Sequence, residues 1–149
     1  MRRALEDGFE LDDDPARIDV DAVHAFIAGE SYWGRGRPRK LTEEAIRGSR
    51  RVIGLYRDGA QVGFARAVSD GATVAYLADV YVLADCRGRG LGLALVREIV
   101  DGEVDGVVTR VRWMLHTADA QALYARLGFS EEAAAYPLME RGRDYDSRA

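Results

Sequence analysis

The stretch LADVYVLADCRGRGLGLALVREIV, residues 77–100, joins two different hydrophobic patterns. Its first part continues a nearly all-apolar run that begins at Thr73, which is typical of a strand with both faces covered. Its last part repeats apolar residues at helical spacing, with Leu91, Leu95 and Ile99 on one face. The sequence therefore predicts a central strand, a glycine-rich loop and a helix in direct succession.

The loop between these elements combines glycine with arginine, as phosphate-binding loops do. A strand–loop–helix junction directs several backbone N–H groups at one point, where the helix dipole adds partial positive charge. Gly88, Gly90 and Gly92 would let a phosphate group approach the backbone closely. The dinucleotide fingerprint and the P-loop motif do not match, because neither the third glycine nor the Gly-Lys pair is in place. The alternative is that these glycines only form a tight turn.

A second glycine–arginine stretch, YWGRGRPRK at residues 32–40, lacks this context. No predicted strand leads into it, and no predicted helix begins directly after it. We therefore expect phosphate binding at residues 87–92 and not at residues 32–40.

The remaining patterns predict helices, then a run of antiparallel strands, then alternating strands and helices. Asp58-Gly59 is a strong tight-turn signal between two strand-like runs and predicts a β-hairpin. Thr42 is a candidate N-cap, and Gly128 is a candidate C-terminal cap. This order predicts a single α/β (mixed α+β) domain, residues 1–149, whose mostly antiparallel central sheet has helices on both faces. The predicted elements are helices at 19–29, from Thr42, at 91–100 and at 119–127, and strands at 51–56, 61–68, 73–83, 107–116 and 136–141.

The composition is that of a globular protein in a reducing compartment. The 149 residues suit one domain with one core, and 48% of them are hydrophobic and 31% charged. No apolar run approaches the roughly 20 residues of a membrane span, and the N-terminus lacks the apolar core of a secretory signal. Cys86 is the only cysteine, which excludes an internal disulfide and a cysteine-based zinc site. With two histidines far apart, no metal site is predicted, and a cytoplasmic location without membrane contact is expected.

Charge is unevenly distributed, although the net charge is only −4. Residues 6–14 hold six carboxylates, and residues 35–51 hold seven basic and two acidic side chains. Two solvated surface segments are the simpler interpretation, and an acidic rim facing a cationic substrate is the alternative. Net acidity and the lack of a known binding motif argue against nucleic acid as a partner.

Residues 87–92, RGRGLG, match the R/Q-x-x-G-x-G/A signature of the GCN5-related N-acetyltransferases (GNAT). The run before them resembles the family's fourth strand, and residues 91–100 resemble its third helix. Farther on, LHTADAQALYARLGF at 115–129 is similar to the family's fifth strand, fourth helix and Gly-Phe exit. The order of elements resembles the family over nearly the whole chain, least in the N-terminal region. Relatives often read His-Gly-Leu-Tyr where this chain has Gln121-Ala-Leu-Tyr, which alters the contacts near the tyrosine.

The resemblance implies acetyl-CoA as the co-substrate and an amine of a small molecule or protein as the acceptor. In the family, backbone N–H groups of the signature loop bind the CoA pyrophosphate, and the strand before it pairs with the pantetheine arm as an added strand would. Carried over, the pyrophosphate-binding residues are Arg87, Gly88, Arg89, Gly90, Leu91 and Gly92. The pantetheine-binding residues are Val80, Tyr81 and Val82.

Tyr124 matches the family's tyrosine by its place in the helix, so the resemblance implies that it is the general acid for the CoA thiolate. Direct attack of the amine needs no covalent enzyme intermediate, so Cys86 is expected to be a bystander. The alternative is that Tyr124 is ordinary core, because it shares a helix face with Leu123 and Leu127.

The general base has two candidates. Asp79 is the only charge inside an apolar strand, and a buried carboxylate needs partners or a raised pKa. Its alternative role is to bond backbone groups and hold the sheet open, and strand alternation places it on one face with Leu77 and Tyr81. His116, which ends a predicted strand near Tyr124 in the sequence, is the other candidate.

In the family, the segment between the first two helices helps to shape the acceptor site. Tyr32 and Trp33 are therefore candidates for an aromatic wall, and the alternative is an exposed loop with one aromatic ring in the core. The competing function is a non-catalytic acyl-CoA-binding sensor of the same fold. Transfer of another acyl group stays open, and a homodimer through the last strands is a further hypothesis.

Overall fold

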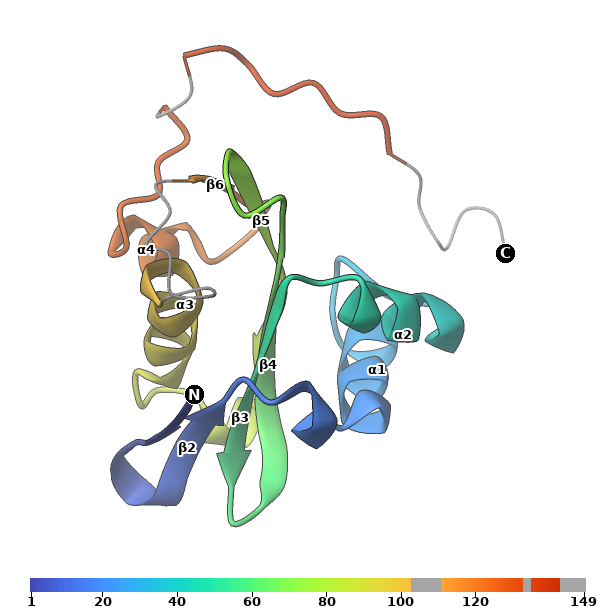
Figure 1. Ribbon diagram of the computed structural model, residues 1–149, viewed down its shortest axis with the longest axis vertical. Helices are drawn as coiled ribbons and strands as arrows, with labels where there is room; N and C mark the ends of the chain where they lie inside the picture. The colour runs from blue at the N-terminus through green and yellow to red at the C-terminus, as the bar shows by residue number, and fades with distance from the viewer. Residues whose placement is uncertain (103–110, 133–134, 143–149) are drawn as a thin grey trace.

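The computed structural model describes residues 1–102, 111–132 and 135–142. Its centre is a six-stranded sheet in the order β1-β2-β3-β4-β5-β6 (Figure 1). Neighbouring strands are antiparallel except β5 and β6, which are parallel, so the predicted mixed and mostly antiparallel sheet is confirmed. The strands are β1 (Arg2–Ala4), β2 (Phe9–Asp12), β3 (Arg51–Arg57), β4 (Ala60–Ser69), β5 (Val74–Val82) and β6 (Arg112–Met114).

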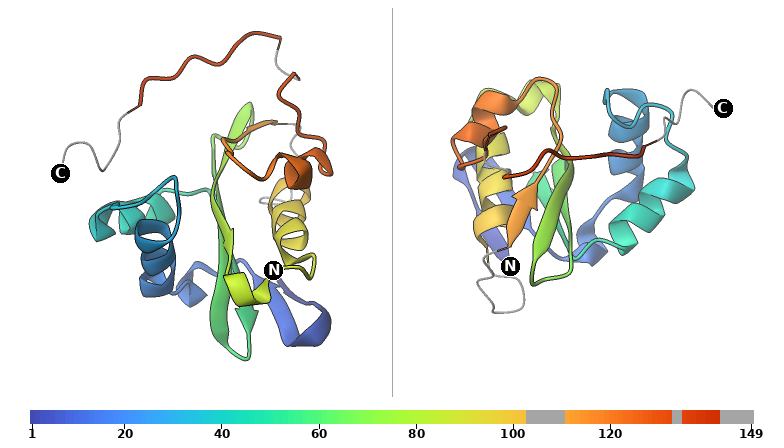
Figure 2. Two further views of the ribbon diagram at one scale, coloured as in Figure 1. Left: turned by 180° about the vertical axis from the view of Figure 1, so that it is seen from behind. Right: turned by 90° about the horizontal axis from the view of Figure 1, so that it is seen from above.

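Helices cover both faces of the sheet, as predicted: α1 and α2 lie on one face and α3 and α4 on the other (Figure 2). Each face has its own core, with Leu95 and Ile99 of α3 buried in one and Phe26 and Ile27 of α1 buried in the other. The helices are α1 (Val20–Gly29), α2 (Arg39–Arg47), α3 (Leu91–Asp101) and α4 (Gln121–Ala125), and the short 3₁₀ turns are η1 (Glu6–Gly8), η2 (Pro15–Arg17) and η3 (Ala84–Cys86).

The sequence patterns missed β1 and β2 and misplaced the start of α2. Pro38 is the N-cap of α2, which begins at Arg39, so the prediction of Thr42 as the cap is wrong. Thr42 is buried inside the helix, and its hydroxyl lies 3.3 Å from Nδ1 of His24 on α1. Pro38 suits a helix start because it brings no N–H group that the first turn would leave unsatisfied.

The prediction of a last strand at residues 136–141 is wrong. This segment forms no strand but crosses over one end of the sheet toward the side of α1 and α2 (Figure 2). Its side chains are largely exposed, with 82% of Tyr136 and 93% of Met139 accessible. Of the strand predicted at 107–116, Arg112–Met114 is confirmed, and residues 107–110 lie outside the described ranges.

A β-bulge interrupts β5 at Asp79. The register of β4 and β5 shifts between Phe64 and Arg66, and Asp79 has a left-handed backbone with φ 53°. The bulge reverses the alternation of side chains, so Leu77 faces the core under α3 while Tyr81 stacks on Phe26 of α1 at 4.0 Å. The prediction that Leu77, Asp79 and Tyr81 share one face is therefore wrong for Leu77.

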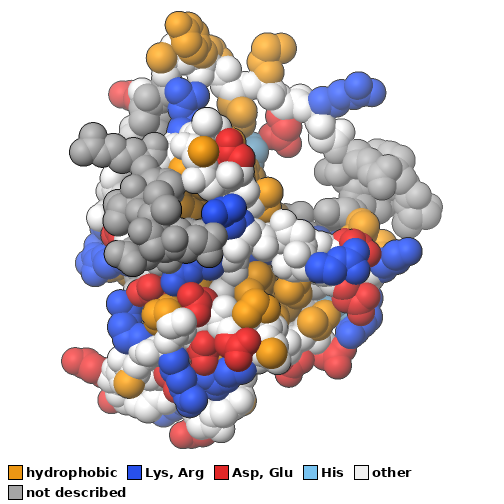
Figure 3. All heavy atoms as spheres, in the orientation of Figure 1, with side chains coloured by type: hydrophobic (Ala, Val, Ile, Leu, Met, Phe, Trp, Pro, Cys, Tyr) orange, Lys and Arg blue, Asp and Glu red, His pale blue; other side chains and the backbone are white. Residues whose placement is uncertain are grey.

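The acidic N-terminal residues pair with arginines of the same region. Arg17 bridges Glu10 and Asp12, and Arg51 binds Asp13 at 3.0 Å. Charges of both signs are interspersed over the face seen in Figure 3. The interpretation of both charged segments as solvated surface is wrong for Asp12, Arg37 and Arg51, which are buried. None of the helices in the described ranges has the length and apolar character to cross a membrane.

Candidate active site

The loop from Gly88 to Gly90 turns the chain from β5 into α3 through two left-handed glycines. Gly88 has φ 79° and Gly90, the N-cap of α3, has φ 74°. The first helical hydrogen bond runs from the Ala94 N–H to the Gly90 carbonyl at 3.0 Å. Within the described residues, no acceptor meets the N–H groups of residues 88–93. These donors and the positive end of the helix dipole form a ready anion-binding site.

Space in front of the loop is open, which is what a bound phosphate requires. A Cβ atom added at Gly88 or Gly90 would meet nothing within 4 Å. Gly92 has a different role, because a Cβ there would lie 3.3 Å from Cδ1 of Leu123 on α4. The first two glycines are therefore needed for backbone conformation, and the third for close packing of α3 against α4.

The outer edge of β5 is open beside this loop. β6 pairs with β5 only at Val74–Tyr76, and residues 77–82 have no strand partner on that side within the described ranges. The Leu83 N–H donates to the Val62 carbonyl on β4 at 2.9 Å. Because the backbone groups of successive strand residues point to opposite edges, the backbone groups of Val82 and Val80 point to the outer edge of β5. Arg87 Nε already donates to the Val82 carbonyl at 2.9 Å. An amide-bearing linear arm fits this edge as an added strand.

β5 and β6 pair only as far as Tyr76 and Met114, and we call the unpaired stretch beyond these residues the opening between β5 and β6. Tyr124 lies in α4, the helix that follows β6 in the chain. Its ring meets Phe129 edge to face, with centroids 5.8 Å apart, and it is half-buried against the core under α3. Burial raises the pKa of Tyr124 to about 12, and Tyr32 and Asp119 add to the effect. The hydroxyl therefore keeps its proton through the neutral range, where it could act as a general acid and not as a general base.

Asp79 is held by three side chains from two other segments. Arg37 binds both carboxylate oxygens at 2.8 and 3.0 Å, Arg66 Nε donates at 2.7 Å, and Trp33 Nε1 donates at 3.0 Å. Burial alone would raise the pKa of Asp79, but hydrogen bonds from Arg37 and the charge of Arg66 outweigh it and hold that pKa below its ordinary value. A carboxylate held in this way is a weak proton acceptor.

Tyr32 and Trp33 extend from the α1–α2 connection across the same region. Their rings meet edge to face at 5.0 Å, and 51% of Tyr32 and 38% of Trp33 remain exposed. The Tyr32 hydroxyl accepts a hydrogen bond from the Ala118 N–H, just before α4, at 2.8 Å. The pair thus reaches from the β5 bulge to the β6–α4 connection.

His116 has partners on both ring nitrogens. Nδ1 is hydrogen-bonded to the Tyr76 hydroxyl of β5, and Nε2 lies 2.7 Å from a carboxylate oxygen of Glu140. Burial raises the pKa of Tyr76, and the charge of Glu140 adds to this. Within the described ranges no group of three or more His, Cys, Asp or Glu side chains could hold a metal ion.

Sequence reasoning missed Arg37 and Arg66, which are 7% and 13% exposed at their side chains. Arg37 belongs to the basic segment 35–51, which was interpreted as solvated surface. Arg66 is the single charge between apolar residues of β4, the same signal that singled out Asp79 on β5. Two opposite charges in adjacent apolar strands are expected to form an ion pair, so the sequence could have indicated the contact between Arg66 and Asp79.

Replacement of Gly34, between Trp33 and Arg37, tests how tightly this segment packs on α1. A Cβ at Gly34 would lie 2.4 Å from Cγ2 of Ile27, which has no room to move in the core. We expect Gly34→Ala to lower the free energy of unfolding by about 1–3 kcal/mol, measured by urea denaturation. Gly29→Ala is the control, because its Cβ meets nothing within 4 Å and alanine favours the helix. Equal stability of the two variants would contradict this packing.

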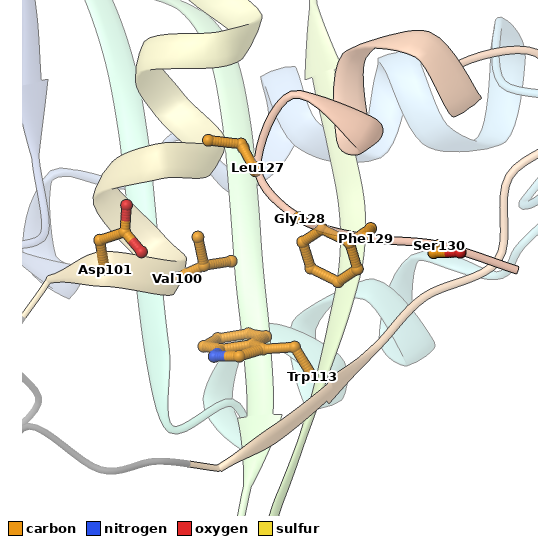
Figure 4. A pocket seen from close by; sticks show the side chains of 7 residues that line it. All are labelled: Val100, Asp101, Trp113, Leu127, Gly128, Phe129 and Ser130. Atoms are coloured by element: carbon orange, nitrogen blue, oxygen red, sulfur yellow. The ribbon is translucent and has the colours of Figure 1, made fainter. Parts of the chain in front are cut away.

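A cavity of about 270 Å³ lies at the opposite end of α3 from the glycine loop (Figure 4). The Trp113 ring of β6 points into it, below Val100 and opposite Phe129. None of the predicted site residues lines it, so it is separate from the candidate active site. Its lining residues are Val100, Asp101, Trp113, Leu127, Gly128, Phe129 and Ser130.

Comparisons with known proteins agree with this geometry. The family model described as "Acetyltransferase (GNAT) domain" matches residues 48–131. "Putative acetyltransferase FG08082" of Gibberella zeae is 31% identical over 132 residues, which cover 76% of this chain and 73% of that protein. A crystal structure of a GNAT-family protein from Xanthomonas campestris pv. campestris has 35% identity and a TM-score of 0.84, with 95% of this chain and 97% of that chain covered.

A more distant solved structure shares the fold alone. Glucosamine-6-phosphate N-acetyltransferase from Arabidopsis thaliana is 13% identical, with a TM-score of 0.60 over 91% of this chain and 99% of that chain. The family model covers more than half of the chain, and the match to the Gibberella protein extends over three quarters of it. The chain therefore belongs to the GCN5-related N-acetyltransferase (GNAT) family and is an acyltransferase.

Proposed function

We propose that this protein transfers the acetyl group of acetyl-CoA to an amine by direct attack. The observation that carries the proposal is the junction of β5 and α3. There the N–H groups of residues 88–93, which meet no acceptor among the described residues, lie beside a strand edge with no strand partner in the same ranges, the two features that a pyrophosphate and an amide-bearing arm require. Gly88, Arg89, Gly90, Leu91 and Gly92 would bind the pyrophosphate through their N–H groups, and Arg87, whose N–H donates to the Ala84 carbonyl, through its guanidinium. Val80, Tyr81 and Val82 would bind the pantetheine arm.

Bound acetyl-CoA supplies a thioester, whose C–S bond breaks as the bond from the amine nitrogen to the carbonyl carbon forms. Tyr124 donates its hydroxyl proton to the sulfur as the C–S bond breaks, because its raised pKa keeps the hydroxyl protonated through the neutral range and the proton is therefore in place when negative charge develops on the sulfur. Tyr32 and Trp33 line the side from which the amine approaches. The proton released by the amine passes to a base or to water.

His116 is the better supported base of the two candidates. Its side chain is 49% accessible, and it would accept a proton once one ring nitrogen leaves its partner, Tyr76 or Glu140, whereas the Asp79 carboxylate is buried and enclosed by four donated hydrogen bonds. We assign Asp79 a structural part in the site. A His116→Gln variant that retained the full pH profile of turnover would leave water as the acceptor of the amine proton.

Calorimetric titration with acetyl-CoA is the first test, with dephospho-CoA and NADP as comparison ligands. We expect saturable binding of acetyl-CoA and of dephospho-CoA, which keeps the pyrophosphate and the pantetheine arm, and none of NADP, which lacks the arm. A panel of amines then tests turnover by the release of free CoA thiol. Absence of acetyl-CoA binding would overturn the proposal, and binding without turnover on every amine would favour the sensor function.

A further inference from the structure

Asp79 and the three side chains that bind it, Trp33, Arg37 and Arg66, form a cluster that links β5 to the α1–α2 connection. Asp79 lies at the bulge of β5, where the strand edge for the pantetheine arm begins. Arg37 and Trp33 reach it from the α1–α2 connection, and Arg66 reaches it from β4. The Arg37 and Asp79 side chains are only 7% and 3% exposed, so solvent does not weaken their two-point ion pair.

The α1–α2 connection is stiffened by its own hydrogen bonds. The Ser31 hydroxyl donates to the Ile27 carbonyl at 2.6 Å and accepts from the Gly34 N–H at 3.0 Å. The Arg37 N–H donates to the Gly34 carbonyl at 2.9 Å, and the Gly36 N–H donates to the Ala28 carbonyl at 3.0 Å. A displacement of Arg37 would therefore move the whole turn, including the aromatic pair.

The far end of the same turn is fastened on the other side of the opening between β5 and β6. Tyr32 accepts a hydrogen bond from the Ala118 N–H, and its proximity contributes to the raised pKa of Tyr124. Trp33, the neighbouring residue, is bound to Asp79 on β5. The turn thus spans the opening, with one attachment on each side.

We propose that Arg37 is a positioning residue for acetyl transfer: bound to Asp79, it holds Tyr32 and Trp33 across the opening between β5 and β6, so that the amine reaches the thioester only past this aromatic pair. The inference rests on the proposed function, since it concerns the acceptor side of that site. Arg37 binds the Asp79 side chain on the face of the sheet that carries α1, whereas the glycine loop and the backbone edge of β5 are where we place CoA, so we expect loss of Arg37 to leave CoA binding intact. Misplacement of a substrate by about 1 Å can cost on the order of 100-fold in rate.

Acrylamide quenching of Trp33 fluorescence tests the proposal directly. The chain has two tryptophans, so Trp113→Phe leaves Trp33 as the single indole reporter. In this background we compare Arg37→Met with Arg35→Met, an exposed arginine of the same turn. We expect Arg37→Met to raise the quenching constant of Trp33 about twofold or more, and Arg35→Met to leave it unchanged, because Arg37 makes the two-point ion pair with Asp79 and the Arg35 side chain is exposed.

Saturating acetyl-CoA supplies a second readout, which a purely structural role would not change. In the parent we expect acetyl-CoA to protect Trp33 from acrylamide, and in Arg37→Met we expect this protection to be lost at an unchanged calorimetric Kd. For any amine that supports turnover, kcat/KM should fall about 10- to 100-fold in Arg37→Met. Arg37→Lys, which keeps the charge without the two-point geometry, should give intermediate values and replaces Arg37→Met if the latter does not fold.

The outcomes separate this inference from the proposed function. If Arg37→Met leaves both the quenching constant and the acetyl-CoA protection of Trp33 as in the parent, the inference is overturned. If acetyl-CoA does not bind the unmodified protein, the proposed function is overturned. The acrylamide quenching of Trp33 without ligand, compared between the parent and Arg37→Met, still tests whether Arg37 positions the turn.

Discussion

Gly90→Asp is expected to abolish measurable binding of CoA while the protein stays folded. A carboxylate at this position would project into the open space in front of the N–H groups of residues 88–93, where we place the pyrophosphate. Two unit charges about 4 Å apart repel by about 4 kcal/mol at an effective dielectric constant of about 20. Solvent at this exposed loop screens part of that energy, so we expect a rise in Kd of about 100-fold or more, measured by calorimetry.

Gly59→Asp is the matched control for this substitution. Gly59 has φ 81° and, like Gly90, nothing within 4 Å of an added Cβ, but it lies in the turn between β3 and β4 and not at a helix N-terminus. Both variants carry the same strain and the same added charge, so similar losses of stability are expected. A CoA affinity that falls equally in both variants, or in neither, would mean that the pyrophosphate does not bind at residues 88–93.

The strand–loop–helix junction at the centre of the chain was predictable because local signals agree there with the tertiary structure. An apolar run, three glycines and a helical repeat follow one another without a gap, and each is found as β5, the loop and α3. The β3–β4 hairpin was equally predictable from Asp58-Gly59, whose φ values of 50° and 81° match the left-handed turn that this dipeptide favours. The same dipeptide at Asp7-Gly8, with φ 56° and 77°, was overlooked. The strands beside it are only three and four residues long, and six nearby carboxylates obscure their alternation.

The contacts around Asp79 were less predictable, because they depend on an interruption in the alternation of side chains along β5. Alternation along β5 fails at Asp79, where one extra residue in the strand turns the following side chains to the opposite face. The local sequence does not indicate a β-bulge at this position, because Asp79 is neither a glycine nor part of a turn sequence. Its partners come from a distant turn and a neighbouring strand, so they become visible only when the sheet brings residues 37, 66 and 79 together.

Tyr124→Phe is expected to lower kcat by about 100-fold or more, because general acid catalysis contributes on the order of 10²- to 10⁴-fold. The hydroxyl makes no contact that acetyl-CoA binding needs at the glycine loop, so the calorimetric Kd should stay within about threefold of the parent value. Turnover is measured as release of CoA thiol with the best amine of the panel. The buried Cys86 should not react with the thiol reagent.

Tyr56→Phe is the control, because it removes a hydroxyl of similar character from a place far from the chemistry. Burial raises the pKa of Tyr56 to about 12, as it does for Tyr124, but the Tyr56 hydroxyl donates to the Arg17 carbonyl at 2.9 Å, beside β3. Its loss should cost about 1 kcal/mol of stability and leave kcat unchanged. Unchanged kcat in Tyr124→Phe would exclude Tyr124 as the general acid. A parallel loss of acetyl-CoA affinity would instead show that Tyr124 acts by shaping the pantetheine channel, because a group that donates its proton only in the transition state does not contribute to binding in the ground state.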